Sequence, residues 1–342
     1  MFKYILKRIG LAFLTMIIIM TLVFVLVKML PLDKPVGTDT ARAAYWTAEV
    51  NRGYVYSSKK DLGNYVDCVT LNGVKTYYYQ VSIVKQYFKW IANILTKWDW
   101  GTSQKIELNI KTSYIIGNRL PVSIKVNFWS AIFSVPLGIA LGIWAALKKN
   151  KPTDTIISTL IMIFISIPSF VLVTFLIYIL CYQWHWLPSS WPDVSATVGQ
   201  KIQGYILPVM CLSFGSIAGY GRITRAELCE VMQSEYLLLA RTKGLTNSQA
   251  IRRHALKNAM VPIFPSIIAE IIGIFTGGSM IVESLYNIPG TGRLYIDSIN
   301  NKDWNVMFVI MAFTVAIGLL SGILLDISYG FIDPRIRMGA KK

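Results

Sequence analysis

The sequence contains few charged residues, and this scarcity excludes an ordinary soluble domain. Only 15% of its 342 residues are charged and 54% are hydrophobic, whereas a soluble domain carries about 25% charged residues. The four cysteines have no C-x-x-C spacing and the two histidines lie far apart, so neither a metal site nor a disulfide framework is expected. The phosphate-binding pattern G-x-x-x-x-G-K-[ST] is absent, and the chain is therefore not expected to hydrolyse ATP by itself.

Long apolar runs take the place of the missing charges. A helix that crosses a membrane needs about 20 mostly apolar residues, and six segments meet this condition. The sequence therefore predicts an all-α polytopic membrane protein with six transmembrane helices. The six expected spans are 9–27, 126–147, 155–184, with a kink at Pro168, 202–221, 258–282 and 304–325.

The basic residues indicate how these spans are oriented. Lysines and arginines precede the first span, separate the second from the third, fill 222–257 and follow the last span. All four blocks fall on one side of a six-helix topology, which predicts a multi-pass protein with cytoplasmic N- and C-termini. The first span is interpreted as a retained helix, because its apolar run is too long for a signal peptide.

The topology divides the chain into four expected parts, the second of them a long extracellular insertion. For the insertion, three interpretations remain open: an amphipathic helix packed on the membrane surface, a small fold of its own, and a platform for a partner. Strands and an irregular loop both remain open for 51–76. The parts are 1–30 (cytoplasmic end and first helix), 31–118 (extracellular segment), 119–335 (five-helix core with a cytoplasmic hairpin over 234–260) and 336–342 (cytoplasmic tail).

The cytoplasmic segment 234–262 has the pattern of two short helices joined by a glycine turn. Ser234 is a plausible N-cap, and Gly244 fits the left-handed position that ends a helix. Thr246 and Gln249 form a capping box that opens the second helix, and Pro262 is placed where a new membrane helix starts. A basic helix in such a hairpin is also typical of DNA-binding proteins. Its position between two membrane spans argues against nucleic acid and favours docking of a protein partner over contact with lipid headgroups.

The same segment resembles the "EAA" signature of permeases from ABC importers. That signature is an alanine, a glycine four residues later and a distant proline, which correspond here to Ala240, Gly244 and Pro262. The spacing, together with "ARTKGL" and "RHALKNA", is similar to the oligopeptide/dipeptide group of the peptide/nickel permease family, first-permease type. Leu238 and Leu239 stand where the signature begins with Glu-Ala. Similarity extends to "YILKRIGLAFLTMIIIMTLVFVLVKMLP", to the outer-face motif over 98–103, to "GGSMIVESLYNIPGTGRL" and to "DPRIR".

The resemblance implies a type I ABC-importer permease fold and ATP-driven import of oligopeptides or dipeptides across a bacterial cell membrane. The implied partners are a second homologous permease, two cytoplasmic ATPase subunits that bind ATP and Mg, an extracellular peptide-binding lipoprotein, the peptide and the lipid bilayer. The chain itself is implied to be non-catalytic. Nickel or another small solute is the alternative cargo, and a secondary transporter or channel is a less favoured class. The residues implied to contact the ATPases are Glu235, Tyr236, Ala240, Arg241, Lys243, Gly244, Leu245, His254, Asn258 and Pro262.

One carboxylate interrupts the fifth apolar run. Ionisable groups inside a membrane are expensive and usually serve a function, so Glu270 is a candidate for the translocation path or for contact with the partner permease. Gly277, Gly278 and Ser279 follow it as small residues suited to close helix packing. Both interpretations stay open for these four residues, and for Glu270 a neutral carboxyl group or one that reaches the membrane surface is a third. Near the end of the chain, Asp326 is expected to pair with Arg335 or Arg337.

Overall fold

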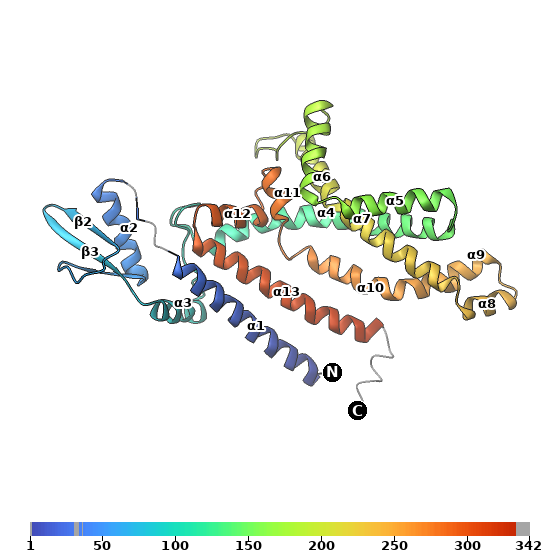
Figure 1. The fold of residues 1–342 in the computed structure, drawn as a ribbon, viewed down its shortest axis with the longest axis horizontal. Helices are drawn as coiled ribbons and strands as arrows, with labels where there is room; N and C mark the ends of the chain where they lie inside the picture. The colour runs from blue at the N-terminus through green and yellow to red at the C-terminus, as the bar shows by residue number, and fades with distance from the viewer. Residues whose placement is uncertain (1, 31–33, 36, 333–342) are drawn as a thin grey trace.

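The computed structural model describes residues 2–30, 34–35 and 37–332. Among these residues, five helices are long and apolar enough to cross a membrane, and one bent pair of helices raises the number to six. The expected helical membrane fold is confirmed, with the bent pair in the place of the third span (Figure 1). The helices are α1 (Phe2–Met29), α4 (Thr112–Leu147), α5 (Pro152–Ser166) with α6 (Ser169–Leu176), α7 (Val198–Val231), α10 (Leu256–Gly273) with the short helices before it, and α13 (Trp304–Ile332).

A small α/β unit is inserted between α1 and α4 and lies at one end of the molecule (Figure 1). Its three strands form an antiparallel sheet in the order β1-β3-β2. The sequence was compatible with either strands or an irregular loop over 51–76, and the structure has strands there. The elements of this part are α2 (Asp39–Arg52), β1 (Val55–Ser58), β2 (Asp67–Leu71), β3 (Val74–Gln80) and α3 (Ile83–Lys97).

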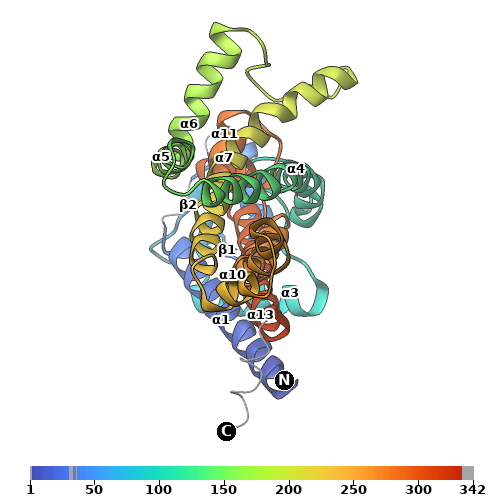
Figure 2. The ribbon, with the colours of Figure 1, turned by 90° about the vertical axis from the view of Figure 1, so that its right-hand side faces the viewer.

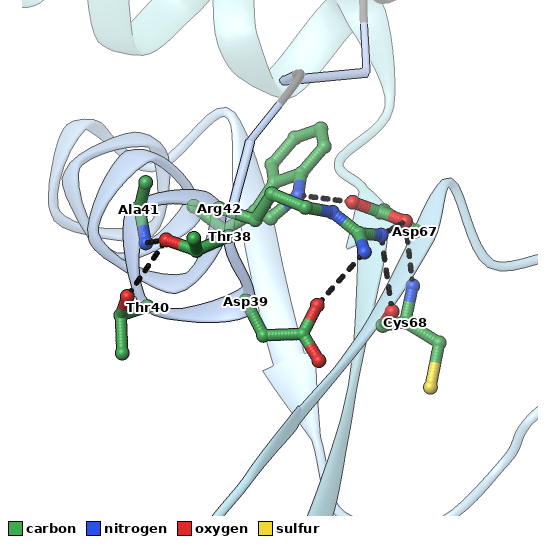
Figure 3. Close-up of polar contacts among 8 residues, drawn as sticks. Thr38, Asp39, Thr40, Ala41, Arg42, Asp67 and Cys68 are labelled. Carbon is green, nitrogen blue, oxygen red and sulfur yellow. Dashed lines mark hydrogen bonds and ion pairs between the residues drawn. The ribbon is translucent and has the colours of Figure 1, made fainter.

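Asp67 joins α2 to the sheet through two side chains of that helix (Figure 3). Its carboxylate accepts a hydrogen bond from the indole N–H of the buried Trp46 at 2.8 Å and pairs with the guanidinium group of Arg42. Burial of the carboxyl group raises its pKa, but the hydrogen bonds from Trp46 and Arg42 outweigh burial and hold the pKa of Asp67 below its ordinary value. The unit is therefore held together by this polar contact as well as by its apolar core.

The loop between α3 and α4 is anchored by Asp303, the residue that precedes α13. The Asp303 carboxylate is fully buried and accepts a hydrogen bond from Ser103 Oγ at 2.6 Å. The same oxygen accepts from the backbone N–H groups of residues 104–106 at 3.0 to 3.2 Å. The motif over 98–103 is thereby attached to the beginning of the last membrane helix.

The first and last membrane helices lie side by side (Figure 1). An aromatic cluster from α1, α3 and α13 fills part of their contact. Arg8 of α1 also forms an ion pair with Asp326 of α13 at 2.8 Å. The expected partners of Asp326, Arg335 and Arg337, lie outside the described residues, as does the tail 336–342.

The third membrane span is broken rather than kinked. The sequence predicts one helix over 155–184, but the helical axis turns by 102° between α5 and α6. Proline has no N–H and disfavours helical backbone in the residue before it, and Ile167 before Pro168 is indeed extended. The helix therefore ends at this point. Beyond α6 the chain continues as the π-helix η1 (Ile177–Gln183), whose Cys181 lies in one buried cluster with Leu207 and Cys211 of α7. Figure 2 shows α5 end-on and α6 rising away from it.

The fifth membrane helix ends at Gly273, so the predicted boundary at residue 282 is wrong. Residues 274–279 are non-helical, and Gly277 has a φ of +111°, a backbone conformation that side-chain-bearing residues rarely adopt. Ser279 Oγ then accepts a hydrogen bond from the Val282 N–H at 3.3 Å and opens a new helix. The helices after this break are α11 (Met280–Leu285) and α12 (Thr291–Asn300).

The Asp67 contact predicts how the small unit responds to acid. Because the folded pKa of Asp67 is lowered, its contribution to stability is present above the unfolded pKa of about 3.9 and is lost as pH falls through the folded value. Asp67→Asn should imitate the acid state at neutral pH, and amide hydrogen exchange of β2 and β3 in the purified chain should then accelerate. Asp61→Asn in an exposed turn is the control. Equal exchange in Asp67→Asn and wild type would show that the contact does not stabilise the unit.

Candidate functional site

The hairpin, residues 234–260, connects α7 to α10. Its first helix, α8 (Glu235–Thr242), begins after Ser234, whose backbone takes the expected N-cap conformation. The Ser234 hydroxyl, however, donates to the Val231 carbonyl oxygen at 2.6 Å and does not cap the helix. Gly244 lies just past the helix with a φ of +91°, as predicted for the position that favours glycine.

The second arm of the hairpin opens with the predicted capping box. The Gln249 N–H donates to Thr246 Oγ1 at 3.3 Å, and the Thr246 N–H donates to Gln249 Oε1 at 3.0 Å. α9 (Asn247–Ala250) then continues through the π-helix η2 (Ile251–Ala255) into α10. Pro262 lies inside α10 and starts no new helix, so that prediction is wrong, because membrane helices tolerate proline. The second arm is therefore continuous with a membrane helix.

A buried cluster fastens the hairpin to three membrane helices. Leu237 of α8 belongs to this cluster and is fully buried. The other members come from the ends of α4 and α7 and from the second arm, so the hairpin is packed as one body with the helices that carry it. The cluster consists of Ala146, Leu228, Cys229, Leu237, Ala250, Ala255 and Ala259.

The surface of the hairpin contains most of the residues that the sequence analysis assigned to docking. Leu245 is half-buried, and Ala240 is buried and packs inside the hairpin. Leu238 and Leu239 are exposed although the sequence analysis did not assign them to docking. The run of three leucines over 237–239 was a usable signal, because a single helical turn that packs on one side cannot bury all three. The exposed assigned residues are Glu235, Tyr236, Arg241, Lys243, Gly244, His254, Asn258 and Pro262.

A bidentate ion pair holds the end of α7 that leads into the hairpin. Arg225 Nε and Nη2 donate to the two carboxylate oxygens of Asp154 at 2.6 and 2.8 Å. Asp154 is buried and also accepts from the Asn150 N–H at 3.1 Å, at the start of α5. In the sequence Arg225 is one of many basic residues, and no pattern around Asp154 singles it out. Bidentate pairs of this kind add directional rigidity, so α5 and α7 are joined next to the hairpin.

A polar cavity of about 320 Å³ lies where α10 breaks, against α4 and α7. Glu270, Gly277, Gly278 and Ser279, the four residues predicted for the path or the permease contact, all line it. Ser216 of α7 donates a hydrogen bond to the Glu270 carboxylate at 3.2 Å. The break in the helix thus brings a carboxylate and a non-helical backbone segment to one cavity.

A second carboxylate, that of Glu283, lies beside Gly278 and was not predicted from the sequence. Glu283 is buried and accepts hydrogen bonds from Ser123 Oγ at 2.7 Å and from the Arg293 N–H at 3.0 Å, in the first turn of α12. A Cβ atom at Gly278 or Gly290 would collide with this carboxylate. The glycines of the "GGSMIVESLYNIPGTGRL" motif therefore make room for Glu283, which joins α4, α11 and α12.

The described residues contain no group of three or more histidine, cysteine, aspartate or glutamate side chains that could hold a metal ion. All four cysteines are free thiols. The candidate sites are the hairpin surface, which is suited to a protein partner, and the polar cavity, which is suited to a polar ligand.

Known proteins resemble the chain over most of its length. An oligopeptide transport system permease protein OppB of Haemophilus influenzae is 31% identical over 98% of this chain and 100% of that protein. A dipeptide transport system permease protein DppB of Lactococcus lactis subsp. cremoris is 31% identical over 99% of this chain and 100% of that protein. OppB of Escherichia coli K12 is 33% identical over 76% of this chain and 83% of that protein.

A solved structure supports the fold independently. The MetNI methionine ABC transporter in an inward-facing conformation has a chain that aligns with a TM-score of 0.51 and 16% identity, covering 65% of this chain and 97% of that one. The sequence from residue 138 to 338 matches the family described as binding-protein-dependent transport system inner membrane component. This match covers the hairpin, the cavity helix α10 and the Glu283 motif. The chain belongs to the family of binding-protein-dependent transport system inner membrane components.

Proposed function

We propose that the chain is a permease subunit of an ATP-driven importer of oligopeptides or dipeptides. The observation that carries this proposal is the hairpin, a packed body with exposed leucines that shares its core with three membrane helices. The full-length likeness to permeases named for oligopeptide and dipeptide transport supports peptides over nickel or another small solute as the cargo. Membership in the transport family disfavours a secondary transporter or a channel.

In this proposal the hairpin docks the cytoplasmic ATPase subunits, which bind ATP and Mg. The exposed Leu238 and Leu239 supply apolar contact area, and the basic residues of the second arm supply charge. A second permease and an extracellular peptide-binding lipoprotein complete the complex in a bacterial cell membrane. Both termini then lie in the cytoplasm, and the insertion 31–118 lies outside the cell. The position of the small α/β unit and of the hairpin at opposite ends of the molecule agrees with this orientation (Figure 1).

The geometry also suggests how motion of the ATPases reaches the membrane. α10 runs without a break from the hairpin core to Gly273, a length of roughly 27 Å at 1.5 Å per residue. The hairpin core contains Ala259 at one end of this helix, and Glu270 faces the cavity near the other end. Because packed cores move as units, displacement of the hairpin is transmitted along α10 to the cavity. The proposed chemistry of the chain is therefore mechanical, and ATP hydrolysis belongs to the partner subunits.

Replacement of Gly244 should uncouple transport. The φ of +91° is strained for any residue with a Cβ atom, although the space around that atom is open. Gly244→Asp should therefore distort the turn and lower ATP-dependent peptide uptake by at least about tenfold, the effect of roughly 1.4 kcal/mol of strain on coupling. Uptake of radiolabelled trialanine by membranes that contain equal amounts of the complex measures this. Normal uptake with the ATPases still bound would contradict the coupling role.

A charge on the exposed face of α8 should release the ATPases. Leu238 is 63% exposed, so Leu238→Glu should leave the fold intact but place an unpaired carboxylate in the proposed apolar contact, weakening binding by about 2 kcal/mol or more. The affinity for the ATPase subunits should therefore fall about thirtyfold or further, and their co-purification in mild detergent should fall with it.

Leu62→Glu is the matched control, because Leu62 has the same 63% exposure but lies in the small α/β unit. It should retain the ATPases at the wild-type level. Retention of the ATPases by both variants would place the docking surface elsewhere.

A further inference from the structure

Among the described residues that line the polar cavity, one is a carboxylate and none is a cation. Glu270 is half-buried in a membrane helix, and its only described hydrogen-bond partner is Ser216. Among the described residues, none of the ion pairs involves Glu270, and no lysine, arginine or histidine lines the cavity. A carboxylate in such a place is stabilised when a cation reaches it, so the cavity is electrostatically suited to a positive ligand.

The other polar groups of the cavity have spare capacity to accept hydrogen bonds. The Asn127 side-chain amide donates to the carbonyl oxygens of Gly277 at 2.8 Å and Ile274 at 3.4 Å. This use of its N–H groups leaves the Asn127 amide oxygen as an acceptor. The Ser216 hydroxyl hydrogen is directed to Glu270, which leaves the lone pairs of that oxygen. A ligand rich in donors, such as an ammonium or guanidinium group, matches this wall.

The size of the cavity limits what can enter. Its volume of about 320 Å³ is at the lower end of ligand pockets, which span about 300 to 1,000 Å³. One cationic side chain or the amino end of a peptide fits such a space, whereas a whole oligopeptide does not. The cavity therefore has the dimensions of a subsite for part of a peptide.

We propose that this cavity is a subsite for a positively charged group of a peptide in transit, either its α-ammonium group or a lysine or arginine side chain. Glu270 accepts charge-assisted hydrogen bonds from the cation, and Ser216 holds the carboxylate in place. Three helices contribute to the wall, with Glu270 from α10, Ser216 from α7 and Asn127 from α4, so a shift of α10 relative to the other two changes the affinity of the subsite. This inference rests on the proposed import of peptides.

The test compares four tripeptides that differ in which positively charged groups they carry. The complete importer with wild-type chain or Glu270→Gln is reconstituted in proteoliposomes, and ATP-dependent uptake is measured for Ala-Lys-Ala and Ala-norleucine-Ala, each with a free or an acetylated amino terminus. The ratio of variant to wild-type uptake for each peptide cancels preferences set by the other subunits. Glu107→Gln is the control, because it makes the same chemical change in a partly exposed ion pair with Arg119 outside the cavity.

Glu270→Gln should lower, roughly tenfold, uptake of the peptides that carry the positive group bound by the subsite, as expected for one lost charge-assisted hydrogen bond. It should leave uptake of acetyl-Ala-norleucine-Ala, which carries no positive charge, unchanged. A fall for acetylated Ala-Lys-Ala assigns the subsite to the side chain, and a fall for free Ala-norleucine-Ala assigns it to the amino terminus. Equal ratios of variant to wild-type uptake for all four peptides would overturn the subsite. This holds whether the ratios are near one or are uniformly reduced, as loss of a contact with the partner permease would make them. Absence of uptake of any peptide by the wild-type importer would overturn the proposed function instead.

Discussion

Close contact between α4 and α7 supports both candidate sites. A Cβ atom at Gly138 would lie 2.6 Å from Tyr220 Cβ, and one at Gly142 would lie 2.6 Å from the carbonyl oxygen of Gly221. Such distances leave room only for glycine, and small residues are the usual means by which membrane helices approach each other. One part of the α4–α7 pair lines the polar cavity, and another part contributes Ala146 and Leu228 to the hairpin core.

The chain can leave the helical conformation after α10 because other groups of the protein form hydrogen bonds with the backbone N–H and C=O groups that the helix no longer pairs. Lipid offers no hydrogen bonds, so non-helical backbone at membrane depth must find its partners within the protein or face a water-filled cavity. Here Asn127 donates to the Gly277 carbonyl oxygen at 2.8 Å, and the Gly278 N–H donates to Thr291 Oγ1 at 3.0 Å. The same break creates the cavity and ends the helix that carries Glu270. A structural requirement of the bilayer and the proposed subsite thus depend on the same few residues.

Local signals in the sequence predicted local structure well. The capping box of Thr246 and Gln249 involves residues three apart, and the left-handed turn at Gly244 depends on that residue's own lack of a Cβ atom. The apolar runs likewise predicted the membrane helices, because burial in lipid needs only length and composition. The resemblance to a permease family added what these patterns alone could not, namely the identity of the proposed partners.

Features that depend on tertiary contacts were not predictable in the same way. Asp154 and Arg225 belong to different helices, and no local sequence pattern around either residue predicts that they pair. The role of Gly278 beside Glu283 follows only from the fold of the broken segment. The strength of the bend at Pro168 and the early end of α10 also depend on surrounding packing, since membrane helices often continue through proline and glycine.

The central claim is that the surface of the hairpin contacts an ATPase subunit directly. Incorporation of a photo-crosslinking amino acid at Leu239, which is exposed on α8, tests this claim in intact membranes without detergent extraction. Illumination followed by mass spectrometry of the adduct identifies whatever lies against that position. The account predicts a covalent adduct with a cytoplasmic ATPase subunit. Adducts with lipid alone, or with no ATPase in cells that are importing peptide, would contradict it.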